Sequence, residues 1–438
     1  MHEFLKRREF VKLTTAGMGA ASVLDVSQVQ AGRGANDKLV VALIGCGGRG
    51  MSDAGQFKKL PNVEVAYVCD VDVARLASAS KSLNVPAKKA VSDLRKVLDD
   101  KSVDAVIVAT PDHWHSLAAI LACDAGKHVY VEKPISHNIR EGRLLVEASA
   151  RNKTLVQHGT QVRSTSTMIE AVKRLREGII GDVLVAKCWN IQRRGLLPPG
   201  QDTLPPPGFD YDSWVGPATL IPYRTNRVHN RWTMWYHFGV GEAGNDGVHD
   251  LDYTRWGLGV ETHPSKISAN GGKFYFNDET EFPDTQQATF EYPGDGKPGS
   301  QRLLIYEQRL WSTNYPHNTD SGAEFYGTKG QMFLSRRGKL TVLGDRNAAV
   351  KLDVELKPQD DAAHVHNFCD SIRIGTKPNA DALTGHLSTS LAHLANIATR
   401  VGRSLSFDPI KEQFLGDDEA NKLIRREYRE HWGTPQGA

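Results

Sequence analysis

The chain has 438 residues, of which 40% are hydrophobic and 24% charged, a composition typical of a globular protein with room for two domains. Lys and Arg number 54 against 51 Asp and Glu, which gives a net charge of +3 without a long basic run and makes nucleic acid a poor candidate partner. Five scattered cysteines lack a Cys-x-x-Cys spacing, so we expect small buried side chains rather than a disulfide framework or a zinc site.

The N-terminal segment differs from the rest of the chain. Lys6-Arg7-Arg8-Glu9-Phe10 precedes a mildly apolar stretch over 13–24 and a small-residue end at Ala31. This order is typical of a twin-arginine signal, so we expect residues 1–31 to direct export by the twin-arginine machinery to the periplasm or beyond. A basic tail or a short helix is the alternative. The apolar stretch is too short to span a membrane, and no later stretch approaches the required length.

After a linker over 32–37, residues 38–160 alternate between apolar strands and helical stretches. We expect strands at 38–44, 63–69, 103–109, 128–131 and 154–157, and helices at 50–60, 73–83, 92–98, 114–126 and 138–152. Near-continuous Val, Ile and Ala strands separated by helices indicate a parallel sheet covered on both faces. The sequence therefore predicts a doubly wound, nucleotide-binding α/β domain of the Rossmann type.

The pattern changes in the remainder, 161–438. Strands of mixed alternation are expected at 183–191, 265–270, 286–292, 302–308, 323–327 and 331–335, and helices at 364–373 and 383–401. They predict an α+β domain with a largely antiparallel open sheet, whose exposed face would suit a homodimer or homotetramer. The Pro- and Gly-rich stretch 196–222 is expected to be a long loop, a candidate lid or interface arm.

A glycine loop follows the first strand and opens the first helix. Backbone in such a loop can approach a pyrophosphate, and the helix N-terminus offers amide donors to it. The residues expected to bind the cofactor here are Gly45, Gly47, Gly48, Arg49 and Gly50. Asp70 ends the next strand, where a carboxylate accepts hydrogen bonds from the adenosine ribose and repels a 2′-phosphate, so NAD is favoured over NADP. A helix cap is the alternative role for Asp70.

The third strand ends at Thr110 and Pro111, on the ligand-binding edge of such sheets. Trp114 and His115 follow and are expected to line the nicotinamide. His113 and His115 also raise the possibility of a metal, but no third ligand lies nearby, so capping or packing fits them better and no metal is expected.

Glu132-Lys133-Pro134 ends the fourth strand. A Lys at this position can donate a hydrogen bond to a substrate hydroxyl and stabilise the alkoxide that develops during hydride loss. Glu132 would orient the nicotinamide ribose or Lys133. The alternative is an exposed pair before a proline turn.

The stretch 244–252 holds a further candidate group. If a helix begins near Asn245, then Asn245 and His249 share one face and Asp252 lies one turn further. His is a natural proton acceptor at neutral pH. The alternative is a His that caps a helix against the sheet.

Together these motifs resemble the Gfo/Idh/MocA family (glucose–fructose oxidoreductase, inositol dehydrogenase) over essentially everything after the signal. The resemblance rests on the glycine loop, Thr110-Pro111 with His115, Glu132-Lys133-Pro134, 244–252, and the sheet segment 325–330. It implies NAD or NADP in the first domain, a substrate pocket and subunit contacts on the second sheet, and sugars, cyclitols or polyols as substrates.

Residue by residue, the resemblance makes Lys133 the motif lysine and His249 the catalytic histidine. The family commonly has Asp four residues before this His. Here that position is Asn245, which cannot exchange a proton and would instead bind a sugar hydroxyl or the nicotinamide. The other residues expected to contact cofactor or substrate are Gln161, Arg163, Trp235, Tyr236 and Asp246. The aromatic faces of Trp232, Trp235, Tyr236 and His237 are expected to stack on a pyranose ring, with core or interface packing as the alternative.

The sequence therefore predicts an exported NAD-dependent oxidoreductase that acts on a sugar or glycoside hydroxyl with a retained cofactor. One alternative is a glycosidase or lyase that acts through a transient 3-keto intermediate. Another is a non-catalytic sugar-binding protein on a dinucleotide-binding fold.

Overall fold

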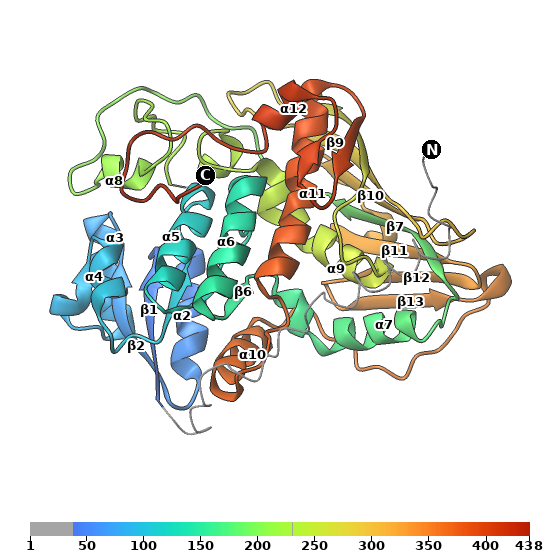
Figure 1. The fold of residues 1–438 in the computed structure, drawn as a ribbon, viewed down its shortest axis with the longest axis horizontal. Coiled ribbons are helices and arrows are strands. Elements are labelled where there is room, and N and C mark those ends of the chain that lie inside the picture. The colour runs from blue at the N-terminus through green and yellow to red at the C-terminus, as the bar shows by residue number, and fades with distance from the viewer. Residues whose placement is uncertain (1–37, 230) are drawn as a thin grey trace, which may run out of the picture.

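The computed structural model describes residues 38–229 and 231–438, which form two sheets with helices around and between them (Figure 1). The signal and linker expected over 1–31 and 32–37 lie outside these residues. Every helix within the described ranges is too short or too polar to span a bilayer. All five cysteines are buried and unpaired, as expected.

The first sheet has six parallel strands in the order β3-β2-β1-β4-β5-β6. They are β1 (Leu39–Ile44), β2 (Val63–Cys69), β3 (Ala90–Val91), β4 (Ala105–Val108), β5 (His128–Val131) and β6 (Val156–His158). Every residue of β4 is buried, as a sheet covered on both faces requires. The strand order reverses between β1 and β4, which is where such sheets form a ligand crevice. The predicted doubly wound domain is confirmed.

Helices cover both faces of this sheet. Those from the first part of the chain are α2 (Gly48–Lys59), α3 (Val73–Leu83), α4 (Leu94–Asp99), α5 (Asp112–Asp124) and α6 (Ile139–Asn152). A further helix, α10 (Asp361–Ile374), returns from near the end of the chain to pack beside α2. Its Phe368 ring lies 6.1 Å from that of Phe57 and 5.9 Å from that of Tyr130. The core of the first sheet therefore includes a helix more than 200 residues away in sequence from its last strand.

The second sheet has nine strands in the order β13-β12-β11-β7-β10-β9-β8-β14-β15. They are β7 (Val183–Asn190), β8 (Lys266–Gly272), β9 (Thr285–Tyr292), β10 (Arg302–Arg309), β11 (Ser321–Gly327), β12 (Gly330–Ser335), β13 (Lys339–Leu343), β14 (Leu405–Asp408) and β15 (Gln413–Phe414). Among the described strand pairs of this second sheet, only β7 and β10 run parallel. The expected largely antiparallel sheet is confirmed. Helices α7 (Ser166–Arg176), α9 (Val248–Leu258) and α11 (Ala382–Val401) share one apolar core with it.

Two irregular segments lie over the carboxyl ends of the first sheet (Figure 1). The stretch predicted as a long loop contains one short helix, α8 (Tyr211–Val215), and its Gly208 carbonyl accepts a hydrogen bond from the Val73 amide at 2.9 Å. After α12 (Asp418–Lys422), the C-terminal tail runs along this loop, and the Arg429 amide donates to the Pro217 carbonyl at 2.9 Å. Loop and tail thus cover the ligand-binding edge.

The segment that leads into α9 departs from prediction. Ala243–Gly247 forms a π-helical turn, η5, and the ordinary α-helix begins only at Val248. Gly247 lies against a neighbouring strand so closely that a Cβ there would be 2.2 Å from the Tyr306 hydroxyl oxygen. The prediction of a regular α-helix that begins near Asn245 is therefore wrong. The wider turn changes how Asn245 and His249 are placed relative to each other.

A buried ion pair fixes α9 against the end of the first sheet. Arg163, in the 3-10 turn η3 (Gln161–Ser164), places its Nε 2.7 Å from Asp252 Oδ2. Asp252 also accepts a hydrogen bond from Ser388 of α11 at 2.6 Å. Although burial opposes ionisation, the Arg163 guanidinium holds the pKa of Asp252 below its ordinary value. The Arg163–Asp252 pair therefore connects η3, α9 and α11.

Replacing Arg163 with Met should destabilise the fold strongly, because it leaves the Asp252 carboxylate buried without its partner. We expect the free energy of unfolding to fall by about 3–5 kcal/mol, measured by urea denaturation. Arg403→Gln removes an exposed pair with Asp417 and is the matched control, expected to have little effect. Equal denaturation midpoints for the two variants would contradict this role.

Candidate active site

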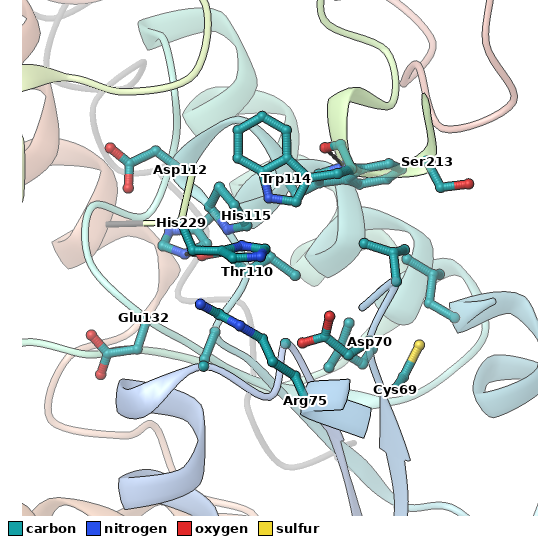
Figure 2. A pocket seen from close by; sticks show the side chains of 18 of the residues that line it. Cys69, Asp70, Arg75, Thr110, Asp112, Trp114, His115, Glu132, Ser213 and His229 are labelled. Atoms are coloured by element: carbon teal, nitrogen blue, oxygen red, sulfur yellow. Dashed lines mark hydrogen bonds between the residues drawn. The ribbon is translucent and has the colours of Figure 1, made fainter. Parts of the chain in front are cut away.

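A cavity of about 580 Å³ lies at the carboxyl ends of the strands of the first sheet (Figure 2). The glycine loop, the ends of β2, β4 and β5, the loop around α8 and the C-terminal tail all contribute to its wall. Asn245 reaches it from the π-turn η5. The cavity therefore combines the edge predicted to bind a dinucleotide with a residue from the helix predicted to carry the chemistry.

The glycine loop has no room for side chains at two positions. Gly45 has φ +94°, and a Cβ there would lie 2.5 Å from the Ala109 carbonyl oxygen. A Cβ on Gly50 would lie 2.1 Å from the Gly45 carbonyl oxygen. The N-terminus of α2, which begins at Gly48 after Gly47, has no side-chain cap among the described residues. Its first amide groups therefore remain available to a phosphate.

Asp70 extends into the same cavity, beside Arg75 (Figure 2). Its Oδ2 accepts from the Cys46 amide at 2.7 Å, and its Oδ1 from the Asp72 amide at 2.9 Å. The helix cap of α3 is Asp72. Burial raises the pKa of Asp70, and these two amides oppose that rise. Each carboxylate oxygen keeps a second lone pair, which suits the predicted contact with a ribose hydroxyl.

The Arg49 side chain is held by carboxylates beneath the loop. It makes contacts of 2.8 Å to Asp53, 2.9 Å to Glu132 and 2.9 Å to Asp361. Glu132 also accepts from Gln161 Nε2 at 2.7 Å. Despite burial, the charges of Arg49 and Lys133 hold the pKa of Glu132 below its ordinary value. The side chains of Arg49, Glu132 and Gln161, all expected to contact the cofactor, thus bind one another; Arg49 and Glu132 line the cavity, whereas Gln161 does not.

The side chains of two residues that follow β4 contact backbone carbonyl groups. His115 places Nδ1 2.6 Å from the Pro134 carbonyl oxygen and Nε2 2.7 Å from that of Thr110. Trp114 donates from Nε1 to the Trp214 carbonyl at 3.0 Å, and its ring lies 5.7 Å from that of Trp432 in the tail. His115 therefore ties the ends of β4 and β5 together, and Trp114 anchors the covering loop and tail. Thr110 and Pro111 line the cavity beside them.

Lys133 is half-buried at the end of β5 and lines the cavity. Its Nζ donates to the main-chain carbonyl of Asn245 and, at 3.1 Å, to the Asn245 Oδ1. Asn245 in turn donates from Nδ2 to Glu242 at 3.2 Å. The structure thus brings the predicted lysine and the residue at the substituted Asp position into direct contact.

His249, at the start of α9, is 5% exposed and is not among the residues of the cavity wall. Its Nδ1 is buried without a hydrogen-bond partner in the described part of the chain. Burial, and then the charges of Arg336 and Lys133, push the pKa of His249 well below its ordinary value, so the imidazole is neutral. Asp246, next to Asn245, binds Arg194 at 2.7 Å and Arg336 at 2.9 Å.

Of the aromatic residues expected to stack on a sugar, Trp235 and Tyr236 do not line the main cavity. Trp235 is buried beneath the Arg227 guanidinium, whose Cζ is 4.4 Å from its ring centroid. Tyr236 faces a second cavity. Trp232, which was also expected to stack on a sugar, does line the main cavity, together with Thr233 and His229 from the same stretch of chain. Sequence spacing alone could not distinguish these neighbours, because the segment has no regular periodicity.

Asp112 is a cavity residue that sequence reasoning passed over, although it lies within the motif after β4. It is buried at the first position of α5, and its Oδ2 accepts from the Val240 amide at 3.2 Å. Burial raises the pKa of Asp112 to about 8, against the opposing charge of Lys133. It therefore titrates close to neutral pH beside the predicted lysine.

Comparison with known proteins gives two family matches. Residues 39–160 match an oxidoreductase family described by its NAD-binding Rossmann fold, and residues 188–434 match the C-terminal alpha/beta domain of an oxidoreductase family. The chain therefore carries an NAD-binding Rossmann domain. The prediction of NAD as the cofactor is confirmed.

Among curated relatives, scyllo-inositol 2-dehydrogenase (NAD(+)) of Bacillus subtilis (strain 168) is 23% identical over 382 residues, covering 86% of this chain and 98% of the relative. Glycosyl hydrolase family 109 protein 2 of Shewanella sp. (strain ANA-3) is 33% identical over 158 residues, 34% of each chain. Among solved structures, levoglucosan dehydrogenase in complex with NADH and levoglucosan has a TM-score of 0.65 at 18% identity, covering 84% of this chain and 99% of that one. This structural similarity establishes the fold.

Gly50→Ala should weaken NAD binding, because its new Cβ collides with the Gly45 carbonyl and must displace the loop. We expect the dissociation constant for NAD to rise at least about tenfold, measured by calorimetric titration of nucleotide-free protein. Gly55→Ala, on the same helix, meets no atom within 4 Å and should bind as the wild type does. Unchanged affinity in Gly50→Ala would contradict the placement of the pyrophosphate.

Asp112→Asn should change how stability depends on pH. The pKa of Asp112 rises from an ordinary 3.8 to about 8 in the fold, so the folded protein holds this proton more tightly than the unfolded chain between those values. The free energy of unfolding of the wild type therefore decreases as pH rises through this window. Asn does not titrate, so this decrease is absent from the variant. The free energy of unfolding of the variant, relative to that of the wild type, should therefore increase with pH and level off above about 8. Denaturation at several pH values measures the difference; exposed Asp99→Asn is the control, and a flat difference would refute the assignment.

Proposed function

Because the chain belongs to the Gfo/Idh/MocA oxidoreductase family, we propose that it is an exported NAD-dependent enzyme that oxidises a hydroxyl group of a sugar or glycoside. The observation that carries this proposal is the contact of Lys133 with Asn245 at the wall of the cavity that begins at the glycine loop. It puts a cationic donor from the NAD-binding domain opposite the turn that leads to His249.

Lys133 is the proposed donor to the oxygen of the substrate hydroxyl. Its ammonium has three N–H donors and gives two of them to oxygens of Asn245, so the third remains for a bound hydroxyl. The positive charge stabilises negative charge that develops on the oxygen as the C–H bond breaks. NAD, when bound, supplies the acceptor for the hydride.

His249 is the proposed proton acceptor. An acceptor must be uncharged before it acts, and the burial of this imidazole keeps it so. The positive charges of Arg336 and Lys133 lower the pKa of this imidazole further. Asn245 would position the substrate hydroxyl, since an amide does not exchange protons.

A carbohydrate is the substrate class that the cavity and the relatives both favour. Trp214 and Trp232 offer aromatic surface in the wall, while Thr233 and His229 offer polar groups. The names of two relatives specify an inositol and levoglucosan. We therefore propose a cyclic polyol or a sugar as the substrate.

Retention of the cofactor is supported by the loop and tail. The bonds between them, and the packing of Trp432 against Trp114, cover the cavity that would hold NAD. Export is supported by Arg7-Arg8 and the apolar stretch after it. A periplasmic enzyme meets little free NAD, so a second sugar or keto compound would return the retained cofactor to its starting state.

A second candidate function is glycoside cleavage through a transient 3-keto intermediate, in which oxidation acidifies the neighbouring C–H and the aglycone is eliminated before re-reduction. The local 33% identity to glycosyl hydrolase family 109 proteins favours it. Turnover of a nitrophenyl glycoside in deuterated water separates the two functions. Deuterium at C2 of a released sugar, with no net change in NADH, supports cleavage; accumulation of a keto sugar supports simple oxidation.

Lys133→Met should abolish most activity without removing the cofactor. After mass spectrometry has quantified the bound nucleotide, a panel of sugars, cyclitols and glycosides is screened at the nicotinamide absorbance. We expect the rate with the best substrate to fall by about 10²–10⁴-fold, while the NAD content stays at the wild-type level. Lys297→Met, in an exposed loop with 80% of the side chain accessible, is the control. Wild-type turnover by Lys133→Met would rule out the proposed role.

A further inference from the structure

A second cavity, of about 240 Å³, lies between the ends of β8 and β9, the last turns of α11 and the segment that follows α12. It shares no wall residue with the main cavity. The proposed reaction uses none of its side chains. Its wall includes Tyr236, Arg400 and Arg426.

Both arginines stack on the same aromatic ring. The Cζ of Arg400 lies 4.1 Å from the Tyr236 ring centroid, and that of Arg426 lies 3.5 Å from it. The ring attracts each cation, but it does not neutralise either charge. The two Cζ atoms therefore lie no more than about 7.6 Å apart, and both side chains belong to the wall of one small cavity.

Neither guanidinium has a carboxylate within 4.0 Å among the described residues. The Nε of Arg426 is buried there without a hydrogen-bond partner. Burial lowers the pKa of Arg426, and the nearby charge of Arg400 lowers it further. Two like charges at short range, one of them largely buried, are unfavourable unless something compensates them.

The surrounding titratable groups leave this positive charge in place. Lys273 also lines the cavity, but its own partner Asp278 lies 2.6 Å away. Buried Glu141 accepts a hydrogen bond from Tyr428, and burial raises the pKa of Glu141 to about 7, so it only partly offsets Arg426. Burial, together with the Arg426 charge, keeps His137 and His393 neutral by lowering their pKa values.

One acidic side chain does reach the wall. Glu281 is exposed at its rim and accepts a hydrogen bond from the Tyr236 amide. It forms no ion pair with either arginine. With Lys273 balanced by Asp278, the two guanidiniums outnumber this single carboxylate, and the cavity keeps a net positive charge.

We propose that this cavity binds a small oxyanion, a carboxylate or a phosphate group, through Arg400 and Arg426. Guanidinium groups present paired N–H donors in a plane that matches two oxygens of such an anion. The bound anion would supply the acceptors that Arg426 lacks and would remove the repulsion between the two cations. The anion could be free in solution or part of a larger acidic ligand.

Thermal unfolding of the full chain tests the proposal, with saturating NAD present so that the phosphate site at the glycine loop is already filled. Sodium phosphate and sodium acetate are titrated separately against sodium chloride at the same ionic strength. We expect a saturable rise of the melting temperature of at least about 2 °C with one of the two oxyanions and none with chloride. A response to phosphate assigns a phosphoryl ligand, and a response to acetate assigns a carboxylate.

Arg400→Gln, at an exposed position near the end of α11, should fold normally and lose the oxyanion response. Arg426→Gln should lose it too and, without oxyanion, should melt no lower than the wild type because it relieves a repulsion. Arg346→Gln, with 92% of the side chain exposed, makes the same charge change elsewhere and should keep the full response. An equal response in Arg400→Gln and Arg346→Gln, or no response in the wild type, would overturn the site. Because unfolding is the readout, failure here would leave the proposed oxidoreductase activity untouched.

Discussion

The hydrogen bonds from Lys133 to Asn245 join the two parts of the molecule at the point where chemistry is proposed. Lys133 comes from the end of β5 in the parallel sheet, and Asn245 from the π-turn before α9 on the second sheet. Each residue alone is an ordinary polar group at the end of an element. Their contact makes the NAD-binding edge and the second sheet two walls of one cavity.

Much of the surrounding structure serves to hold this contact. His115 ties the ends of β4 and β5. Glu132, the neighbour of Lys133, is fixed by Arg49 from the first helix. On the opposite wall, the Arg163–Asp252 pair holds α9 against the end of the first sheet. Several residues that sequence reasoning assigned to ligands thus hold other residues in place, which is how an enzyme keeps its reacting groups rigid.

The sequence predicted what depends on local pattern. Buried strands, the glycine loop and the position of Lys133 follow from short apolar runs and the turns that end them. The π-turn could not be found this way, because spacing arguments assume 3.6 residues per turn. Nor could the return of α10 to the first sheet, or Trp432 beside Trp114, since these contacts join distant parts of the chain. Tyr236, expected to contact substrate, lines a different cavity from Lys133, and the sequence could not show this because the irregular segment that carries it has no periodicity.

A crystal structure with NAD and a bound carbohydrate tests most directly whether the Lys133 ammonium and the neutral His249 imidazole converge on the reacting carbon. We expect the substrate hydroxyl to lie within hydrogen-bonding distance, about 2.6–3.2 Å, of Lys133 Nζ and within reach of His249, directly or through one water, with the nicotinamide facing the same carbon. A nicotinamide turned away from Lys133, or a sugar that His249 cannot reach, would show that these two residues do not carry the reaction.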